Sequence, residues 1–198
     1  MRLLLVTAIV AVLAGAAAHA ADIAADDVML KIEMQSWGQS RGLSPVGADE
    51  ASDGVAMALS GDASAVGALE LPAGDYTLVL WATAPAGDAD GFFVEINGAR
   101  TRLLGRTGSW GTLSLPFTVA QAGPVTIQII GQEPGLTIDQ LAVVRGSYAQ
   151  GEIDYADIPG ETTGESIGLA DIPRLSAPCA LAAVPDAPFA ADEATVFH

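Results

Sequence analysis

Apolar and polar residues alternate along much of the chain between residues 28 and 145. In VMLKIEMQ (residues 28–35), Val28, Leu30, Ile32 and Met34 fall on one side, whereas Lys31, Glu33 and Gln35 fall on the other. GTLSLPFTV (111–119) and VTIQII (125–130) alternate in the same way. A period of two is typical of β-strands that turn one face toward a core.

Turn residues separate further apolar segments at short intervals. Two short strands are expected in VAMALS (55–60) and VGALEL (66–71), and AGDYTLVLWATA (73–84) begins at a Pro-Ala-Gly turn. GFFVEING (91–98) ends in Asn97-Gly98, which is a strong hairpin signal. The pattern predicts an all-β fold over residues 21–146, a jelly-roll β-sandwich of eight or nine short antiparallel strands.

The last of these segments, LTIDQLAVV (136–144), carries an acid between apolar neighbours. Simple alternation predicts two sides, with Leu136, Ile138, Ala142 and Val144 on one and Thr137, Asp139, Leu141 and Val143 on the other. A carboxylate beside a core is costly when it has no partner, so we expect Asp139 to have one.

The two ends of the chain differ from this central region. Residues 1–20 combine Arg2, an apolar run and the small-residue site Ala18-His19-Ala20, which is typical of a secretory signal peptide. We therefore expect a secreted or periplasmic protein without membrane insertion. Residues 147–198 form an acidic, Pro/Ala/Gly-rich tail of low order, of which Ile153, Tyr155 and Ile158 are candidates to pack on the sandwich.

Composition narrows the functional classes. The chain has 24 acids against 8 Lys and Arg, a net charge of −16, which argues against nucleic acid as a partner. Cys179 is the only cysteine, so no internal disulfide is expected. The two histidines are His19, in the predicted signal peptide, and His198, at the end. A hydrolase would have to use carboxylates alone, and no pair of acids converging on a cleft is evident, so we predict no enzyme.

Several segments, in order, resemble a known family. They are KIEMQ, LPAGDYTLVLWATAP, FFVEINGA, TGSW, AGPVTIQII and EPGLTIDQLAVV. Their succession over residues 28–146 resembles the carbohydrate-binding modules of families 6 and 35, which are jelly rolls of the galactose-binding-like group.

The resemblance implies a structural calcium ion between the first and last strands. The matching positions are Glu33, Gln35 and Asp139, with an amide at Gln35 where relatives usually have a second carboxylate. Calcium takes carboxylate, amide and carbonyl oxygens, so this set is chemically suitable. The alternative is that Asp139 only accepts hydrogen bonds, from Gln35, Thr137 or backbone amides.

The resemblance also implies a sugar-binding site. Trp110 matches a loop tryptophan that stacks on sugar in many relatives, and Trp37 is the second candidate wall. Thr137 falls where several relatives have a sugar-bonding Asn. Trp81 lies opposite the predicted core face of its strand, on the concave sheet, which is a second binding surface in some relatives. Coverage by the acidic tail is the alternative, and we favour it.

Cations gather just before Trp110. Arg100 and Arg102 would share one face of a strand, with Arg106 following. Guanidinium groups bind carboxylates and sulfates, which suggests an acidic polysaccharide as ligand. Pairing with surface acids is the simpler alternative.

Together these features favour a secreted, non-catalytic carbohydrate-binding module for a polysaccharide or cell-surface glycan, acting alone or beside a separate carbohydrate-active enzyme or envelope protein. The alternative is a structural or adhesion module of the cell envelope on the same fold, without sugar binding. That alternative predicts that Trp37 and Trp110 are both buried.

Overall fold

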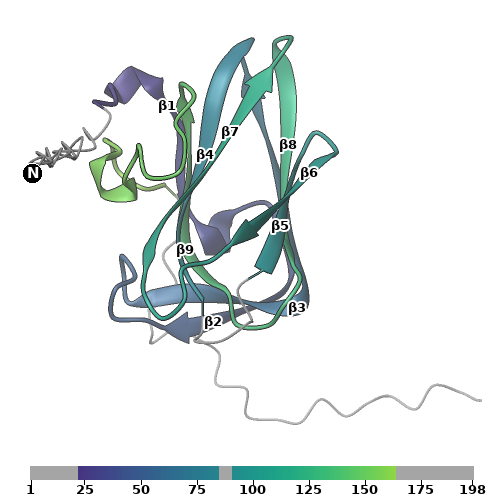
Figure 1. Ribbon diagram of the computed structural model, residues 1–198, viewed down its shortest axis with the longest axis vertical. Helices are drawn as coiled ribbons and strands as arrows, with labels where there is room; N and C mark the ends of the chain where they lie inside the picture. Colours follow the sequence, from purple (N-terminus) through teal and green to yellow (C-terminus); the bar gives the residue numbers. More distant parts are fainter. Residues whose placement is uncertain (1–21, 85–90, 164–198) are drawn as a thin grey trace, which may run out of the picture.

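A computed structural model describes residues 22–84 and 91–163 of the chain (Figure 1). The predicted signal peptide (1–20), Cys179 and the tail from residue 164 onward lie outside the described residues. The described part contains nine strands: β1 (Val28–Glu33), β2 (Gln39–Gly47), β3 (Val55–Leu71), β4 (Gly74–Thr83), β5 (Gly91–Ile96), β6 (Ala99–Leu104), β7 (Gly111–Val119), β8 (Gly123–Gly131) and β9 (Thr137–Arg145). Its helices are the short 3-10 turns η1 (Ala25–Asp27), η2 (Met34–Ser36) and η3 (Tyr155–Asp157), and none is long or apolar enough to cross a membrane.

The strands form one curled antiparallel sheet in the order β6-β5-β8-β3-β9-β4-β7. β1 pairs with β9, and β2 pairs with β3. The long β3 closes the sandwich, because Met57 and Ala58 pair with β9 while residues 64–71 pair with β8. Figure 1 shows β4, β7 and β9 on one side, β5, β6 and β8 on the other, and β2 and β3 across the bottom. The predicted jelly-roll β-sandwich is confirmed.

The core lies between the two sides and contains the alternating residues that the sequence predicts. On β4 they are Tyr76, Leu78, Leu80 and Ala82, which meet Val125, Ile127 and Ile129 of β8 in one apolar cluster. The predicted Asn97-Gly98 hairpin is also present, since both residues have positive φ (49° and 84°) and Ile96 pairs with Ala99. These local signals were reliable because side-chain alternation and turn chemistry act over only a few residues.

Two strand assignments differ from the sequence prediction. VAMALS and VGALEL are parts of the single strand β3, which continues through Gly61 and Asp62. β2, with residues QSRGLSPVG, was not predicted, because it is mostly exposed and has no apolar alternation.

The alternation on β9 changes phase at Asp139. Trp81 of β4 opposes Gln140, but the next residue, Ala82, opposes Ile138, so Asp139 is left over as a bulge. Ile138 and Leu141 therefore both point into the core, whereas Ala142 lies on the outer face. The predicted grouping of Ile138 with Ala142 and Val144 was wrong, because a bulge shifts every later side chain to the opposite face.

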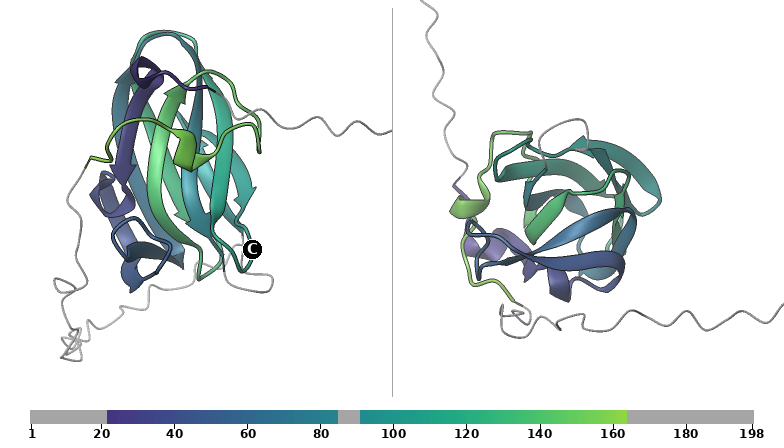
Figure 2. Two further views of the ribbon diagram at one scale, coloured as in Figure 1. Left: turned by 90° about the vertical axis from the view of Figure 1, so that its left-hand side faces the viewer. Right: turned by 90° about the horizontal axis from the view of Figure 1, so that it is seen from below.

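Residues 147–163, which we call the 147–163 segment, cross the outer face of the sheet (Figure 2, left). Ile153, Tyr155 and Ile158, the three residues predicted to pack on the sandwich, are buried there. They lie against Val79, Ala142 and Val144. The folded unit thus extends beyond the predicted boundary at Gly146. Apolar residues on the outer faces of β4 and β9 explain this, because they need a cover.

Polar contacts hold this segment on both sides of the sheet. Gln150 donates to Thr112 O (2.7 Å) and accepts from Ser114 N (2.9 Å), so its amide substitutes for a neighbouring strand at the free edge of β7. At the other end, Thr163 N donates to Lys31 O (2.8 Å) and Glu33 N donates to Thr163 O (3.1 Å) beside β1.

Candidate functional site

Three carboxylates from distant parts of the sequence meet at one end of β1. They belong to Glu33 at the end of β1, Asp53 in the turn before β3, and Asp139 in the β9 bulge. One oxygen from each lies within 4.8 Å of the other two. Glu33 is 6% exposed and Asp139 is fully buried at 0%, so like charges are concentrated in a poorly solvated place.

Hydrogen bonds satisfy only part of this cluster. Ser52 N donates to Asp139 Oδ2 (2.9 Å), and Ser52 Oγ donates to Glu33 Oε1 (3.1 Å). Gln140 Nε2 also donates to Glu33 Oε1. Glu33 Oε2 is buried and has no hydrogen-bond partner among the described residues. An unpaired buried carboxylate oxygen is costly, and a cation bound among these carboxylates would offset that cost.

The pKa values of the two buried carboxyl groups reflect this environment. Burial raises the pKa of Asp139 to about 7, and the charges of Glu33 and Asp53 add to the rise against hydrogen bonds from Ser52. Burial also raises the pKa of Glu33, opposed by hydrogen bonds from Gln140 and Ser52. A divalent cation would reverse both effects because it stabilises the ionised forms.

The donor set fits calcium, with one change from the expected ligands. Asp53 supplies a third carboxylate that the sequence analysis missed, although the acid-rich turn GADEASDG was a signal for it. Gln35 does not extend the strand beside Glu33, because the chain turns into η2 at Met34. The side-by-side arrangement of Glu33 and Gln35 was therefore wrong, and Gln35 as a ligand stays a prediction. Both of its amide atoms are buried without a hydrogen-bond partner in the described part.

A small cavity of about 180 Å³ connects this cluster to the outer face of the sheet. Its lining includes Ser52, Asp139, Gln140, Trp81 and Tyr155. Burial, followed by the charges of Glu33 and Asp139, raises the pKa of the Tyr155 hydroxyl, which therefore remains protonated. The acid cluster and the aromatic site described next thus share Trp81 as a wall.

Trp81 and Trp110 form a stacked pair, with ring centroids 6.0 Å apart and planes inclined by 25°. Trp81 projects from β4, and Trp110 comes from the loop just before β7. Both are partly exposed, and both line a pocket of about 460 Å³. The indole N–H of Trp81 donates to Glu50 O (3.3 Å), which holds the Trp81 ring in place.

Polar residues complete this pocket, and most of them come from the 147–163 segment. Gln150, Glu152, Asp154 and Asp157 lie along it, with Arg106 beside Trp110. Asp154 accepts from Thr112 Oγ1 (2.9 Å) and Glu152 accepts from Ala149 N (2.7 Å). An aromatic platform with a few fixed polar groups around it is the usual form of a sugar site.

Trp37 does not belong to this site. It is only 4% exposed and packs in the core under Gly67 of β3, where an added Cβ would lie 2.6 Å from its ring. The predicted second sugar-binding wall at Trp37 is therefore wrong, because neither face of the ring is open. The loop-like sequence SWGQSRG was misleading, since η2 turns the side chain inward.

The other predicted ligand contacts are placed outside the Trp81–Trp110 pocket. Thr137 is half-buried, and its hydroxyl donates to Gly135 O (3.2 Å). Arg100 forms an ion pair with Glu95 at 2.9 Å on β5 and β6. Arg102 donates to Gln132 Oε1 (3.1 Å). The simpler interpretation of Arg100, pairing with a surface acid, is thus confirmed for that residue.

No protein-family model and no curated protein matches the chain. Solved structures do match its fold. The chain has the fold of the carbohydrate-binding modules of families 6 and 35, as the order of motifs suggested.

Three matches describe this likeness. The C-terminal family 6 module of the marine laminarinase LamC from Zobellia galactanivorans is 20% identical with a TM-score of 0.50, over 59% of this chain and 98% of the module. A family 6 module of Cellvibrio mixtus lichenase 5A, in complex with cellotriose, is 14% identical with a TM-score of 0.52, over 60% and 98%. The family 35 module of Cellvibrio japonicus Abf62 is 21% identical with a TM-score of 0.50, over 60% and 95%.

Proposed function

We propose that this protein is an exported, non-catalytic carbohydrate-binding module and that the Trp81–Trp110 pocket is its sugar site. The carrying observation is the stacked pair at the wall of a polar pocket on this fold. The apolar C–H face of a pyranose ring packs on an indole, while Glu152 and Asp157, which line the same pocket, would accept hydrogen bonds from hydroxyl groups.

The acid cluster is better suited to a metal than to catalysis. A carboxylate-based glycosidase needs two accessible acids on either side of the scissile bond. Glu33 and Asp139 have raised pKa values, but both are buried and are bonded by Ser52. We propose instead that Glu33, Asp53 and Asp139 hold a structural calcium ion, which would join β1, β9 and the turn before β3.

One of the two observations expected from the structural or adhesion alternative is present in the structure. It predicts that Trp37 and Trp110 are both buried, and Trp37 is. Trp110, however, remains partly exposed in a pocket, which favours ligand binding.

A panel of neutral and acidic oligosaccharides, titrated calorimetrically with calcium present, tests the proposal. Trp110→Ala should weaken binding by about 2 kcal/mol or more, roughly thirtyfold. Phe93→Ala is the matched control, because Phe93 is a partly exposed aromatic residue on β5 outside the pocket. If no glycan binds to the folded protein, the adhesion alternative is preferred.

A further inference from the structure

A second hollow, of about 580 Å³, adjoins the Trp81–Trp110 pocket and shares Arg106, Gln150 and Gly151 with it. Its other lining residues are Arg102, Leu103, Leu104, Leu113 and Ser114. It is lined by two arginines and by no acid of the described part, although acids outnumber Lys and Arg by 24 to 8 in the chain. This hollow is therefore a cationic site on an acidic protein.

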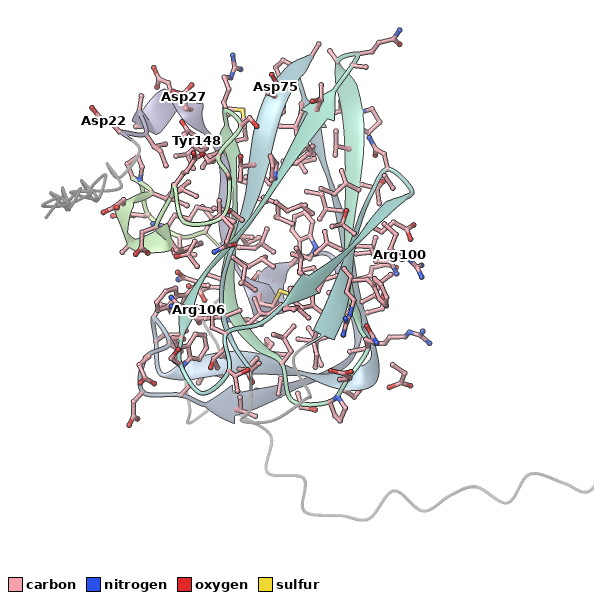
Figure 3. All side chains as sticks on the ribbon, in the orientation of Figure 1. Asp22, Asp27, Asp75, Arg100, Arg106 and Tyr148 are labelled. Atoms are coloured by element: carbon pink, nitrogen blue, oxygen red, sulfur yellow. The ribbon has the colours of Figure 1, made fainter. Side chains whose placement is uncertain are left out.

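Within residues 22–84 and 91–163, no carboxylate pairs with the two arginines of this hollow. Arg102 bonds only the neutral amide of Gln132, and the exposed Arg106 side chain has no hydrogen bond or ion pair within the described ranges. Arg100, in contrast, is paired with Glu95 and lies on the far side of the molecule from Arg106 in Figure 3. Unpaired guanidinium groups present planar donor sets that match carboxylate or sulfate oxygens.

Apolar side chains lie beside these cations. Leu104 is 53% exposed, the largest exposure of a bulky apolar side chain in the described part, and Leu103 lies next to it in the hollow. A small inorganic anion would gain nothing from such a surface. A sugar ring that carries an anionic group would bury its C–H face on the leucines while its charge meets the guanidinium groups.

We propose that this hollow is an anion subsite for a uronate carboxylate or sulfate ester on the sugar next to the one stacked at Trp110. This proposal rests on the proposed sugar binding. The two hollows also impose a direction on the glycan. Glu152, Asp154 and Asp157 line the tryptophan pocket and repel a negative group there, so the anion must lie at the Arg102–Arg106 end.

The test compares charged and neutral forms of one backbone with the full exported chain. Galacturonate oligomers are titrated against their methyl esters, and sulfated carrageenan oligomers against their desulfated forms, at one calcium concentration. At least one charged form should bind about tenfold tighter than its neutral counterpart, which is the scale of one charge-assisted hydrogen bond. The pair that shows the difference identifies the anion. The preference should shrink in 1 M salt, where charges are screened beyond about 3 Å.

Arg106→Gln should remove the preference, and Arg102→Gln should reduce it. Arg100→Gln, the same change of charge on the same β-hairpin but outside the hollow, should leave it intact, and equal thermal midpoints would show that all three variants fold. Equal affinity for charged and neutral oligomers, or equal losses in Arg100→Gln and Arg106→Gln, would overturn the anion subsite and leave sugar binding standing. If no oligomer binds to the folded protein, or if Trp110→Ala leaves the affinity unchanged, both proposals are overturned.

Discussion

Trp81 and Trp110 stack with their ring centroids 6.0 Å apart, and the Trp81 N–H donates to Glu50 O, whereas the Trp110 N–H has no hydrogen-bond partner among the described residues. Trp81 opposes Thr112 across the β4–β7 pair, so Trp110 leans over it from the loop two residues before Thr112. The Trp81 ring also packs against the apolar cluster that the 147–163 segment covers. The proposed sugar site therefore predicts different roles for the two tryptophans, with Trp110 as the surface that contacts sugar and Trp81 as its support.

A comparison of the two alanine variants should separate these roles. Trp110→Ala is expected to weaken glycan binding with little change in stability. Trp81→Ala should weaken binding and also lower the free energy of unfolding by about 2–3 kcal/mol, since it removes a partly buried aromatic side chain. Urea unfolding and calorimetric titration of both variants measure the two quantities. Equal stability losses in the two variants would contradict the assigned roles.

Trp37 should affect stability and not binding. Trp37→Ala is expected to cost about 3–5 kcal/mol of unfolding free energy, because it empties a core position beneath Gly67. The milder Trp37→Phe should remain folded and retain wild-type glycan affinity. A loss of affinity in folded Trp37→Phe would return Trp37 to the sugar site.

Calcium should stabilise the protein through the acid cluster. At a calcium concentration about 100 times the Kd, the gain is about 2.7 kcal/mol, or roughly 8 °C in Tm. Asp139→Asn or Asp53→Asn should abolish the gain, whereas Asp26→Asn, an exposed acid on η1, should not. Thermal unfolding in calcium and in chelator tests this, and an identical Tm in both would exclude the calcium site.

Without calcium, stability should fall as the pH rises from about 4 to about 7. Burial raises the pKa of Asp139 to about 7, and burial raises that of Glu33 as well. A carboxyl group with a raised pKa holds its proton more tightly in the folded protein, so its contribution to stability is present below the unfolded pKa and is lost as the pH passes the folded one. Chelator-treated protein, unfolded with urea across this range, measures the slope. Asp139→Asn should flatten it, and an unchanged slope in that variant would assign the effect to other groups.

The 147–163 segment should be required for stability. A chain that ends at Gly146 leaves Val79, Ala142 and Val144 uncovered and loses the burial of Ile153, Tyr155 and Ile158. We expect it to unfold with at least about 3 kcal/mol less free energy than a chain that ends at Thr163, and to aggregate more readily. Equal stability of the two chains would contradict the extended domain boundary.

A single substitution at Gln150 tests the contact between the 147–163 segment and β7 without removing the segment. Gln150→Ala should cost about 1–3 kcal/mol, because it removes two hydrogen bonds to the edge of β7. Gln39→Ala, an exposed position on β2, is the matched control and should change little.

The fold was largely predictable because its signals are local. Tyr76, Leu78, Leu80 and Ala82 occur at every second position of β4, and they face the core as the pattern predicts. The Asn97-Gly98 turn likewise depends only on two residues that tolerate positive φ. The strand β2 escaped prediction because its exposed residues have no such pattern.

The candidate site was less predictable because its residues meet through long-range pairing. Glu33 and Asp139 were expected to be neighbours, and they are, but the bulge at Asp139 does not follow from alternation. Asp53 joins them only because the turn before β3 folds over the end of β1. Trp37 and Trp110 have similar polar, glycine-containing surroundings in the sequence, yet one is buried and the other lines a pocket.

The sequence by itself therefore determined the class of fold, the core face of most strands and one of the two tryptophans of the candidate site. These depend on periodicity and turn chemistry, which act over a few residues. Only the tertiary structure decided that Trp81 supports Trp110, that Asp53 completes the acid cluster, and that residues 147–163 build half of the pocket. Each of these depends on strand register, the β9 bulge and the burial of an outer sheet face, which arise when distant segments pack together.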